Sequence, residues 1–236
     1  MENIEKLLQQ EAAKFGVELS AEQTAQFQTY MEELLDWNTK INLTAITEPR
    51  EFVEKHFVDC LRPLEWMNLA GTNCIDVGTG AGFPGIPLKL AVAQMHLTLL
   101  DSLQKRLKVL DTVCADLHLE AKIVHARAEE GGRNPELREK FDYVFARAVA
   151  PLSVLCEYCL PYVRQGGYFC AWKGPAGEKE RQEAQRAMQI LGGKISQEEN
   201  YLLPDGSHRT FLKICHVHSS PAKYPRTGVK IRKFPL

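Results

Sequence analysis

The sequence predicts an α/β fold: a seven-stranded, mostly parallel sheet with helices around it and an antiparallel hairpin at its end. Three patterns support this prediction. Residues 74–85 begin as a short apolar run and continue as a glycine-rich turn, before a helix-like segment that reaches about residue 92. A second apolar run, 96–101, ends on an acidic residue. Further short apolar runs then alternate with amphipathic segments, as in consecutive β–α units.

The composition is that of one large globular domain. The 236 residues are 44% hydrophobic and 25% charged, which is ordinary for a globular chain long enough to bury a sizeable core. No uncharged apolar run reaches about 18 residues, so no membrane span is expected. Residues 1–14 are charged throughout, which is unlike a secretory signal. We therefore expect a cytoplasmic protein, and we expect it to be a monomer.

The seven cysteines also favour a reducing cytoplasm, because they lie in apolar runs without the spacing of a disulfide framework. Cys156 and Cys159 form a C-x-x-C pair, which raises the alternative of metal or redox chemistry. Both fall on the apolar face of a segment with helical spacing, together with Leu152, Leu155 and Leu160. We interpret them as core residues and expect no metal site.

Two amphipathic helices open the chain. Apolar residues recur at helical spacing from Ile4 to Phe15. Ser20 with Gln23 forms a capping-box pattern at the start of a second helix, which reaches about Trp37. Because these helices precede the first strand, we expect them to cap the sheet.

A loop and a third helix follow. Residues 37–46 are too irregular for a helix interior, and two interpretations stay open: a packed loop, or a loop beside the ligand mouth whose amides and Lys40 contact substrate. The third helix is expected from Thr47 to about Leu61, with a proline in its first turn. His56 lies close to apolar positions of this helix and is interpreted as a hydrogen-bonded core histidine.

The remaining elements follow from the same patterns. Strands are predicted at 123–125, 141–146, 167–172, 195–203 and 208–216, and helices at about 103–117, from 151, and at 178–191. Five residues fall at predicted strand ends: Gly78, Asp101, Glu129, Arg147 and Lys173. Ligands of such sheets bind at the carboxyl ends of the strands, so these residues are expected to line one binding edge.

The spacing of the glycines in the turn indicates which cofactor it could bind. The simplest alternative is an ordinary tight loop without a ligand. The dinucleotide pattern G-x-G-x-x-G fails from Gly78, because its sixth position is Phe83. Gly80, Gly82 and Gly85 do complete this pattern, but the pattern then begins two residues after the start of the turn at Gly78. The D-x-G-x-G-x-G pattern from Asp76 resembles motif I of class I methyltransferases, which bind S-adenosylmethionine. Asp101, at the end of the second strand, is suited to accept the ribose hydroxyls.

Further motifs extend this resemblance over nearly the whole chain. They are Asn42-Leu43-Thr44-Ala45-Ile46, His56-Phe57-Val58-Asp59, the run from Asp76 to Pro87, Asp101-Ser102, Arg127-Ala128-Glu129, Ala146-Arg147-Ala148, Trp172-Lys173-Gly174 and Tyr224-Pro225-Arg226. The set resembles the ribosomal RNA small-subunit methyltransferase G family, also called the glucose-inhibited division protein B family. The resemblance implies a class I methyltransferase fold, S-adenosylmethionine as cofactor, and methylation of N7 of one guanosine in 16S rRNA.

The resemblance also implies roles for individual residues. Cofactor contacts carry over to Gly78, Phe83, Ala128, Glu129 and Arg147, and the ribose position to Asp101 and Ser102. The implied partner is small-subunit rRNA or a ribosomal particle. A nicotinamide-linked oxidoreductase and a non-catalytic RNA-binding protein on the same scaffold remain the alternative functions.

The chemistry of the chain agrees with an N7 acceptor. The fourth strand ends in Ala146-Arg147-Ala148-Val149 instead of the motif of exocyclic-amine methyltransferases, and the Pro-Cys pair of cytosine-C5 enzymes does not occur. Guanine N7 already has a lone pair, so its attack on the sulfonium methyl needs no general base. We name no catalytic residue and take Arg147 and Lys173 as candidate positioning residues, because positioning alone can supply about 7–11 kcal/mol. A 2′-O transfer set of Lys40, Asp142 and Lys173 is disfavoured, since Asp142 lies too early in its strand.

Charge is distributed unevenly along the chain. Residues 1–70 contain 6 Lys/Arg and 13 Asp/Glu, whereas residues 201–236 contain 7 and 1. We expect one domain over 1–236, made of a helical cap (1–70), a cofactor-binding sheet (71–216) and a basic tail (217–236). Proline and glycine make a helix in the tail unexpected. Its RNA-binding residues are expected to be Arg226, Lys230, Arg232 and Lys233, with Lys173 on the body of the domain.

Overall fold

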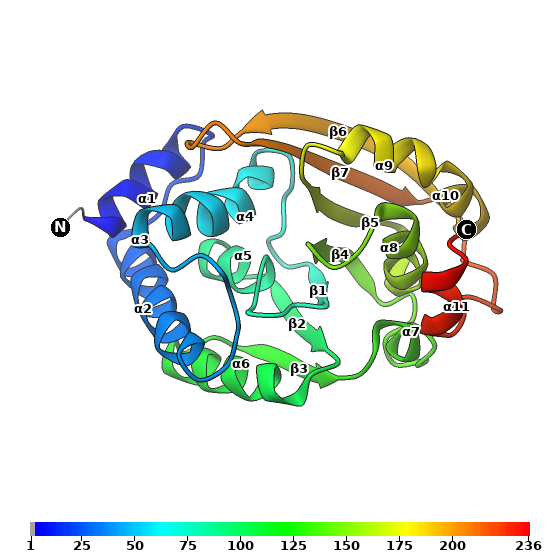
Figure 1. Cartoon of the computed structure of the whole chain (residues 1–236), viewed down its shortest axis with the longest axis horizontal. Helices are drawn as coiled ribbons and strands as arrows, with labels where there is room; N and C mark the ends of the chain where they lie inside the picture. Colours follow the sequence, from blue (N-terminus) through cyan, green and yellow to red (C-terminus); the bar gives the residue numbers. More distant parts are fainter. Residues whose placement is uncertain (1–2) are drawn as a thin grey trace.

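A seven-stranded sheet forms the centre of the computed structural model, which describes residues 3–236, and it confirms the predicted fold class (Figure 1). The strand order is β3-β2-β1-β4-β5-β7-β6. Neighbouring strands among β1 to β5 run parallel, whereas β7 is antiparallel to both β5 and β6. The strands are β1 (Asn73–Val77), β2 (His96–Asp101), β3 (Ala121–His125), β4 (Phe141–Arg147), β5 (Val163–Lys173), β6 (Gly193–Leu202) and β7 (His208–His216).

Alternating side chains of the strands build a separate hydrophobic core on each face of the sheet. In β1, Cys74 belongs to one core, whereas Ile75 and Val77 belong to the other. In β4, Phe145 and Ala146 divide in the same way. This alternation follows from the two-residue period of a strand, and it requires apolar cover on both sides of a buried sheet.

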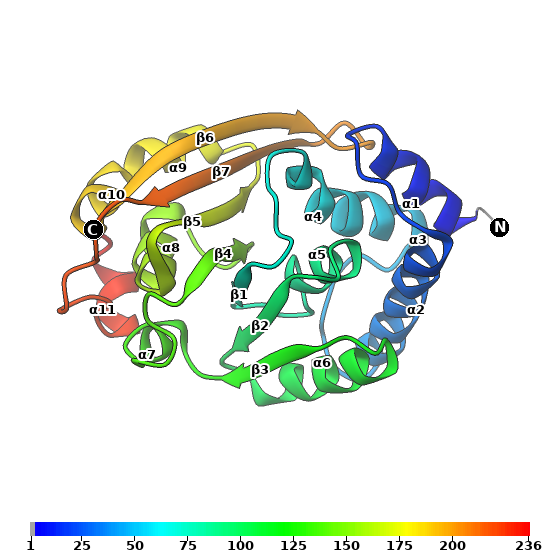
Figure 2. The same cartoon turned by 180° about the vertical axis from the view of Figure 1, so that it is seen from behind.

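The N-terminal helices cover the first face, together with the helices that follow β1 and β2 (Figures 1 and 2). They are α1 (Ile4–Ala13), α2 (Ala21–Asn38), α3 (Pro49–Phe52), a π-helical turn (Val53–Val58), α4 (Asp59–Leu61), a 3₁₀ turn (Arg62–Glu65), α5 (Gly85–Ala91) and α6 (Gln104–Asp116). The Ser20–Gln23 capping box is present at the start of α2, as predicted. No helix in the described part of the chain is long and apolar enough to cross a membrane.

The second face is covered by α7 (Ala128–Gly131), α8 (Leu152–Cys159), a 3₁₀ turn (Leu160–Tyr162), α9 (Gly177–Glu183) and α10 (Gln185–Leu191). Cys156 and Cys159 are fully buried here, which confirms their interpretation as core residues. The single helix predicted over 178–191 is instead two helices that meet at Ala184.

The C-terminal tail contains a helix, α11 (Gly228–Lys233), so the prediction of a non-helical tail is wrong. Glycine and proline do not interrupt this helix, because Pro225 precedes it and Gly228 is its first residue. Tyr224 and Ile231 are buried in the second core, and α11 lies beside α7 and α8 in both views (Figures 1 and 2). Tertiary burial therefore stabilises a helix that its local sequence does not favour.

An ion pair attaches the tail to α8. Arg226 Nη2 lies 2.7 Å from Glu157 Oε2, and Arg226 Nε and its backbone N–H donate to Oε1 at 2.9 and 2.7 Å. The Glu157 side chain is only 1% exposed. Arg226 was expected to contact RNA phosphate, but its guanidinium already has a carboxylate partner inside the protein.

Breaking this pair from the arginine side should destabilise the protein. Arg226→Ala is expected to lower the free energy of unfolding by about 3 kcal/mol, because it leaves the buried Glu157 carboxylate without a counter-ion. Urea unfolding monitored by circular dichroism measures this loss. The double variant Arg226→Ala/Glu157→Gln should recover part of it, and Lys223→Ala on the exposed face of the tail should change stability by less than about 0.5 kcal/mol. A single variant as stable as the wild type would show that the pair does not hold the tail.

Candidate functional site

The glycine-rich turn is held by a buried carboxylate. Asp76 is fully buried at the end of β1, and its Oδ2 accepts hydrogen bonds from Thr79 Oγ1 at 2.8 Å and from the Gly85 N–H at 2.9 Å. A Cβ at Gly85 would come within 3.1 Å of the Asp76 Cβ and 2.9 Å of Leu99 Cδ2, so a larger residue would push these side chains away. Asp76 Oδ1 has no hydrogen-bond partner within residues 3–236. Burial raises the pKa of Asp76 to about 6.

Asp101 connects the end of β2 to the same turn. Its Oδ2 accepts from the Gly80 N–H at 3.0 Å, and its Oδ1 accepts from the Leu103 N–H at 2.8 Å. Arg106 Nη1 lies 3.8 Å from Oδ2. Two carboxylates therefore fix the turn. Asp76 binds it from within β1, and Asp101 binds it from the end of the neighbouring strand β2.

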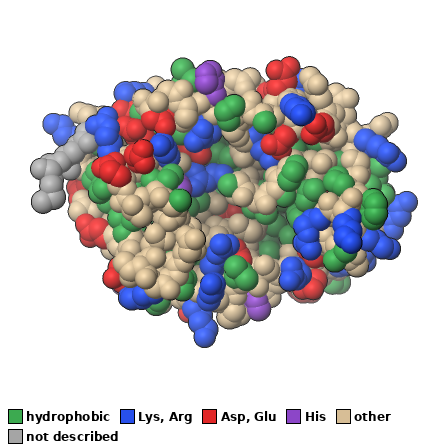
Figure 3. Space-filling view, in the orientation of Figure 1, with side chains coloured by type: hydrophobic (Ala, Val, Ile, Leu, Met, Phe, Trp, Pro, Cys, Tyr) green, Lys and Arg blue, Asp and Glu red, His purple; other side chains and the backbone are tan. Residues whose placement is uncertain are grey.

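The turn and Asp101 border a cavity of about 510 Å³ at the carboxyl ends of the strands, which we call the first cavity, whereas Asp76 lies buried behind the turn. Figure 3 shows this face of the molecule hollowed near its centre, with Lys and Arg side chains in and around the hollow. The structure brings together all seven residues predicted to contact a cofactor. Those that line the first cavity are Gly78, Phe83, Asp101, Ser102, Ala128, Glu129 and Arg147.

Arg147 is the centre of a polar cluster at the cavity wall. Its Nη1 donates to Asp59 Oδ2 at 2.9 Å and to the Lys55 carbonyl at 3.2 Å, and its guanidinium lies 5.0 Å from the centre of the Phe83 ring. The sequence places no acid near Arg147, so a functional role was the expectation. In the structure Asp59, from the helix at 49–61, is its partner, and Arg147 therefore stabilises the fold as well as lining the cavity.

His56 belongs to the same cluster, and its tautomer follows from its partners. Arg147 Nη2 lies 2.8 Å from His56 Nδ1, and since a guanidinium only donates, Nδ1 must be the acceptor. His56 Nε2 then carries the proton and donates to Thr44 Oγ1 at 2.9 Å. Burial and the Arg147 charge lower the pKa of His56 to about 3, so the ring is neutral. The predicted hydrogen bonds of His56 are confirmed, but its place in the core is not, because the ring is only partly buried and lines the first cavity.

Thr44 is a site residue to which the sequence gave no individual role. Its Oγ1 accepts from His56 Nε2 and from the Ile46 N–H at 3.0 Å, so its own hydroxyl proton remains available as a donor. Leu43 and Thr44 line the first cavity, which places part of the loop at 37–46 beside the mouth. Lys40 instead pairs with Asp36 at 2.8 Å and is absent from that lining within the described chain.

A second cavity of about 610 Å³ adjoins the first and shares His56 and the segment 147–150 with it. Lys55, Trp172, Lys173 and Arg209 line its other sides. Lys173 is buried, and its Nζ donates to the Ala150 carbonyl and pairs with Glu180 Oε2, both at 2.7 Å. The two cavities therefore meet at the Arg147 wall.

Two other predicted positions have different surroundings. Asp142 is the second residue of β4, where it accepts from the Asn73 N–H and pairs with Arg164, which confirms its early place in the strand.

Arg232 was expected to contact RNA from a separate basic tail, yet it lines the first cavity. Only the folded position of α11 reveals this, because 103 residues separate Arg232 from Glu129 in the sequence.

Comparison with known proteins gives a consistent result. The family model for rRNA small subunit methyltransferase G matches residues 23–203. The ribosomal RNA small subunit methyltransferase G of Lactobacillus johnsonii is 45% identical, over 98% of this chain and 99% of that protein. Its counterpart in Alkaliphilus metalliredigens is 47% identical over 98% of each chain. A solved O-methyltransferase from Bacillus cereus in complex with SAH shares the fold, with a TM-score of 0.56 and 16% identity over 79% of this chain and 90% of that one.

The buried Asp76 carboxyl predicts a distinct pH dependence of stability. Its ordinary pKa of 3.8 is raised to about 6 in the folded protein, so between these values the folded state keeps a proton that the unfolded chain releases. The stabilising contribution is complete below the unfolded value and is lost as the pH rises through 6. From about pH 3.5 to about pH 7, the wild type should lose roughly 2–3 kcal/mol of stability relative to Asp76→Asn, which does not titrate.

Urea unfolding of both proteins across this range measures the difference. Asp142→Asn serves as a control of opposite sign, because hydrogen bonds from the Asn73 N–H and Arg164 outweigh burial and lower the pKa of Asp142. Asp142→Asn should be less stable than the wild type at neutral pH, and this difference in stability should shrink as the pH falls. Parallel pH profiles for the wild type and Asp76→Asn would contradict a raised pKa at Asp76.

Proposed function

The chain belongs to the family of rRNA small subunit methyltransferase G, and we propose that it transfers the methyl group of S-adenosylmethionine to N7 of one guanosine in 16S rRNA. Family membership rests on the model match over 23–203 and on relatives that are similar over almost their whole length. It favours this function over a nicotinamide-linked oxidoreductase or a non-catalytic RNA-binding protein.

In this proposal the first cavity holds S-adenosylmethionine. Asp101, with Ser102 beside it, accepts the ribose hydroxyls; its carboxylate offers about four acceptor positions, of which the Gly80 and Leu103 N–H groups use two. Ala128 and Glu129 border the adenine at the turn after β3. The residues of the cavity thus fit an adenosine cofactor at a strand-end site.

The second cavity takes the acceptor guanosine. It meets the first cavity at Arg147, so a base that enters it would lie next to the cofactor. Lys55, Lys173 and Arg209 line it, and the acidic partner of each leaves only part of their positive charge for the rRNA backbone. We propose small-subunit rRNA or a ribosomal particle as partner, and a cytoplasmic monomer as the working form.

The observation that carries the N7 assignment is that the ionisable groups at the junction are already engaged. Both nitrogens of His56 have partners, Arg147 at Nδ1 and Thr44 at Nε2. Asp59 is paired with Arg147, and Glu180 with Lys173. A transfer that needed a general base would need one of these groups free. Guanine N7 attacks with its own lone pair, so such a site can act by positioning alone.

Mapping 7-methylguanosine in 16S rRNA tests the proposal. Small subunits from cells that lack this protein should be missing one such methylation, and the purified protein with S-adenosylmethionine should restore it. Incubation of the same particles without the protein is the control. Restoration at a different atom of guanine would overturn the N7 assignment, whereas no transfer to naked rRNA or to any ribosomal particle would overturn the function.

Thr44 should contribute to this transfer through its hydroxyl. In Thr44→Val the His56 Nε2–H loses its acceptor and the site loses a free donor, so we expect the rate of methyl transfer to fall by about tenfold or more. Thr44→Ser keeps the hydroxyl and should retain most of the activity. Single-turnover assays on ribosomal particles at saturating cofactor measure the rates, and melting temperatures report on stability. Equal rates in the valine and serine variants would remove the hydroxyl from the mechanism.

A further inference from the structure

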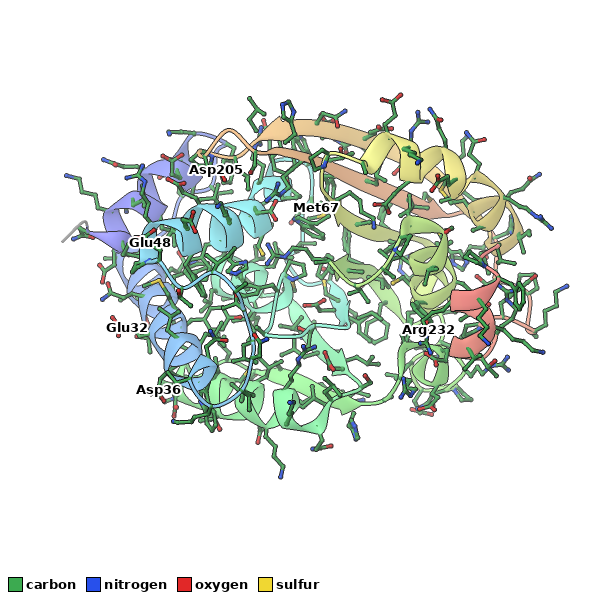
Figure 4. All side chains as sticks on the ribbon, in the orientation of Figure 1. Glu32, Asp36, Glu48, Met67, Asp205 and Arg232 are labelled. Carbon is green, nitrogen blue, oxygen red and sulfur yellow. The ribbon has the colours of Figure 1, made fainter. Side chains whose placement is uncertain are left out.

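The C-terminal tail forms one side of the first cavity. Of the four basic tail residues expected to contact RNA, Arg232 is the one that lines this cavity within the described chain. It extends from α11 toward α7 and α8 (Figure 4). Lys230, Arg232 and Lys233 are all exposed on this short helix, so what distinguishes Arg232 is its place at the cavity.

Several contacts fix the tail in this position, so it is not a frayed terminus. Arg226 forms the buried ion pair with Glu157, and Tyr224 and Ile231 are in the second core. Arg138 donates to the Tyr224 carbonyl at 2.9 Å and to the Ser220 carbonyl at 2.8 Å. Backbone, core and ionic contacts therefore all hold the segment against the second face of the sheet.

The start of α11 lies directly against Glu129. A Cβ at Gly228 would clash with the Glu129 carboxylate and would come within 3.3 Å of Arg232 Nη1. Residues 228 and 232 are four positions apart and share one face of the helix. The absence of a side chain at Gly228 thus lets α11 approach Glu129 and brings Arg232 to the same end of the cavity.

Tyr158 lies at the same end of the first cavity as Arg232 and Glu129. Tyr158, on α8, also lines the cavity, and the Arg232 guanidinium is close enough to oppose the effect of burial and Glu129, which together raise the pKa of this tyrosine. Glu129, Tyr158 and Arg232 come from three elements, α7, α8 and α11. They surround the end of the cavity where the adenine of the cofactor is proposed to lie.

We propose that Arg232 binds the adenosine part of S-adenosylmethionine, so that the C-terminal tail completes the cofactor site. A guanidinium is planar, donates through five N–H groups and stacks on aromatic rings, which suits an adenine better than a lysine would. The inference rests on the proposed cofactor and is independent of the RNA atom that is methylated. It gives Arg232, which was expected to contact RNA, a contact with the cofactor instead.

Calorimetric titration of the full-length protein with S-adenosylmethionine, without RNA, tests the proposal. Arg232→Ala should weaken binding by about 3- to 30-fold, the range for a guanidinium stacked on a ring. Lys223→Ala removes the same charge from the same segment, away from the cavity, and should bind as the wild type does. Arg232→Lys should lie between the two, because it keeps the charge but loses the planar group. Melting curves of the ligand-free proteins show whether α11 remains docked.

A second ligand locates the contact. 5′-Methylthioadenosine retains the adenosine and lacks the amino-acid part, so Arg232→Ala should weaken its binding by the same factor. Unchanged affinity for S-adenosylmethionine in Arg232→Ala, or a loss confined to the complete cofactor, would overturn the assignment to adenosine. A wild-type protein that fails to bind S-adenosylmethionine would overturn the proposed function instead, so the two failures are distinguishable.

Discussion

The ion pair between Arg147 and Asp59 joins the N-terminal helices to the sheet, and both cavities depend on it. Arg147 ends β4, whereas Asp59 begins α4, and their side chains are 12% and 5% exposed. Asp59 also accepts from Tyr201 of β6, and its carbonyl accepts from Trp172 of β5. Because a buried carboxylate is costly without partners, these contacts fix the helix at 49–61 over the strand ends. His56 and Arg147, which these contacts hold in place, form the wall that the two cavities share.

That wall also limits which chemistry the site can perform. The Arg147 contact fixes the His56 tautomer, and the tautomer in turn makes Thr44 an acceptor whose hydroxyl proton is free. A network in which each ring nitrogen has a partner is rigid and well suited to hold a substrate. It is poorly suited to remove a proton. The structural role of the cluster and the base-free transfer proposed for the enzyme thus have the same physical origin.

Local sequence patterns predicted the sheet, the capping box and the residues at the strand ends, because each depends on neighbours in the chain. They could not predict the partners of buried charges. Asp59 lies 88 residues from Arg147, and Glu157 lies 69 residues from Arg226. The tail helix is unexpected for a related reason: its glycine and proline disfavour a helix locally, whereas burial of Ile231 against α8 stabilises it. Arg232 entered the cavity lining only as a consequence of that packing.

The charges that remain free after this pairing favour one direction of approach for RNA. Lys55, Lys173 and Arg209, around the second cavity, each have an acidic partner, so their local field is partly offset. Lys230 and Lys233 lie exposed on α11, at the end of the molecule opposite α1 (Figures 1 and 2). Residues 1–70 carry more than twice as many acidic as basic residues and would repel phosphate. We therefore propose that the RNA backbone lies along α11, beside the first cavity that Arg232 lines.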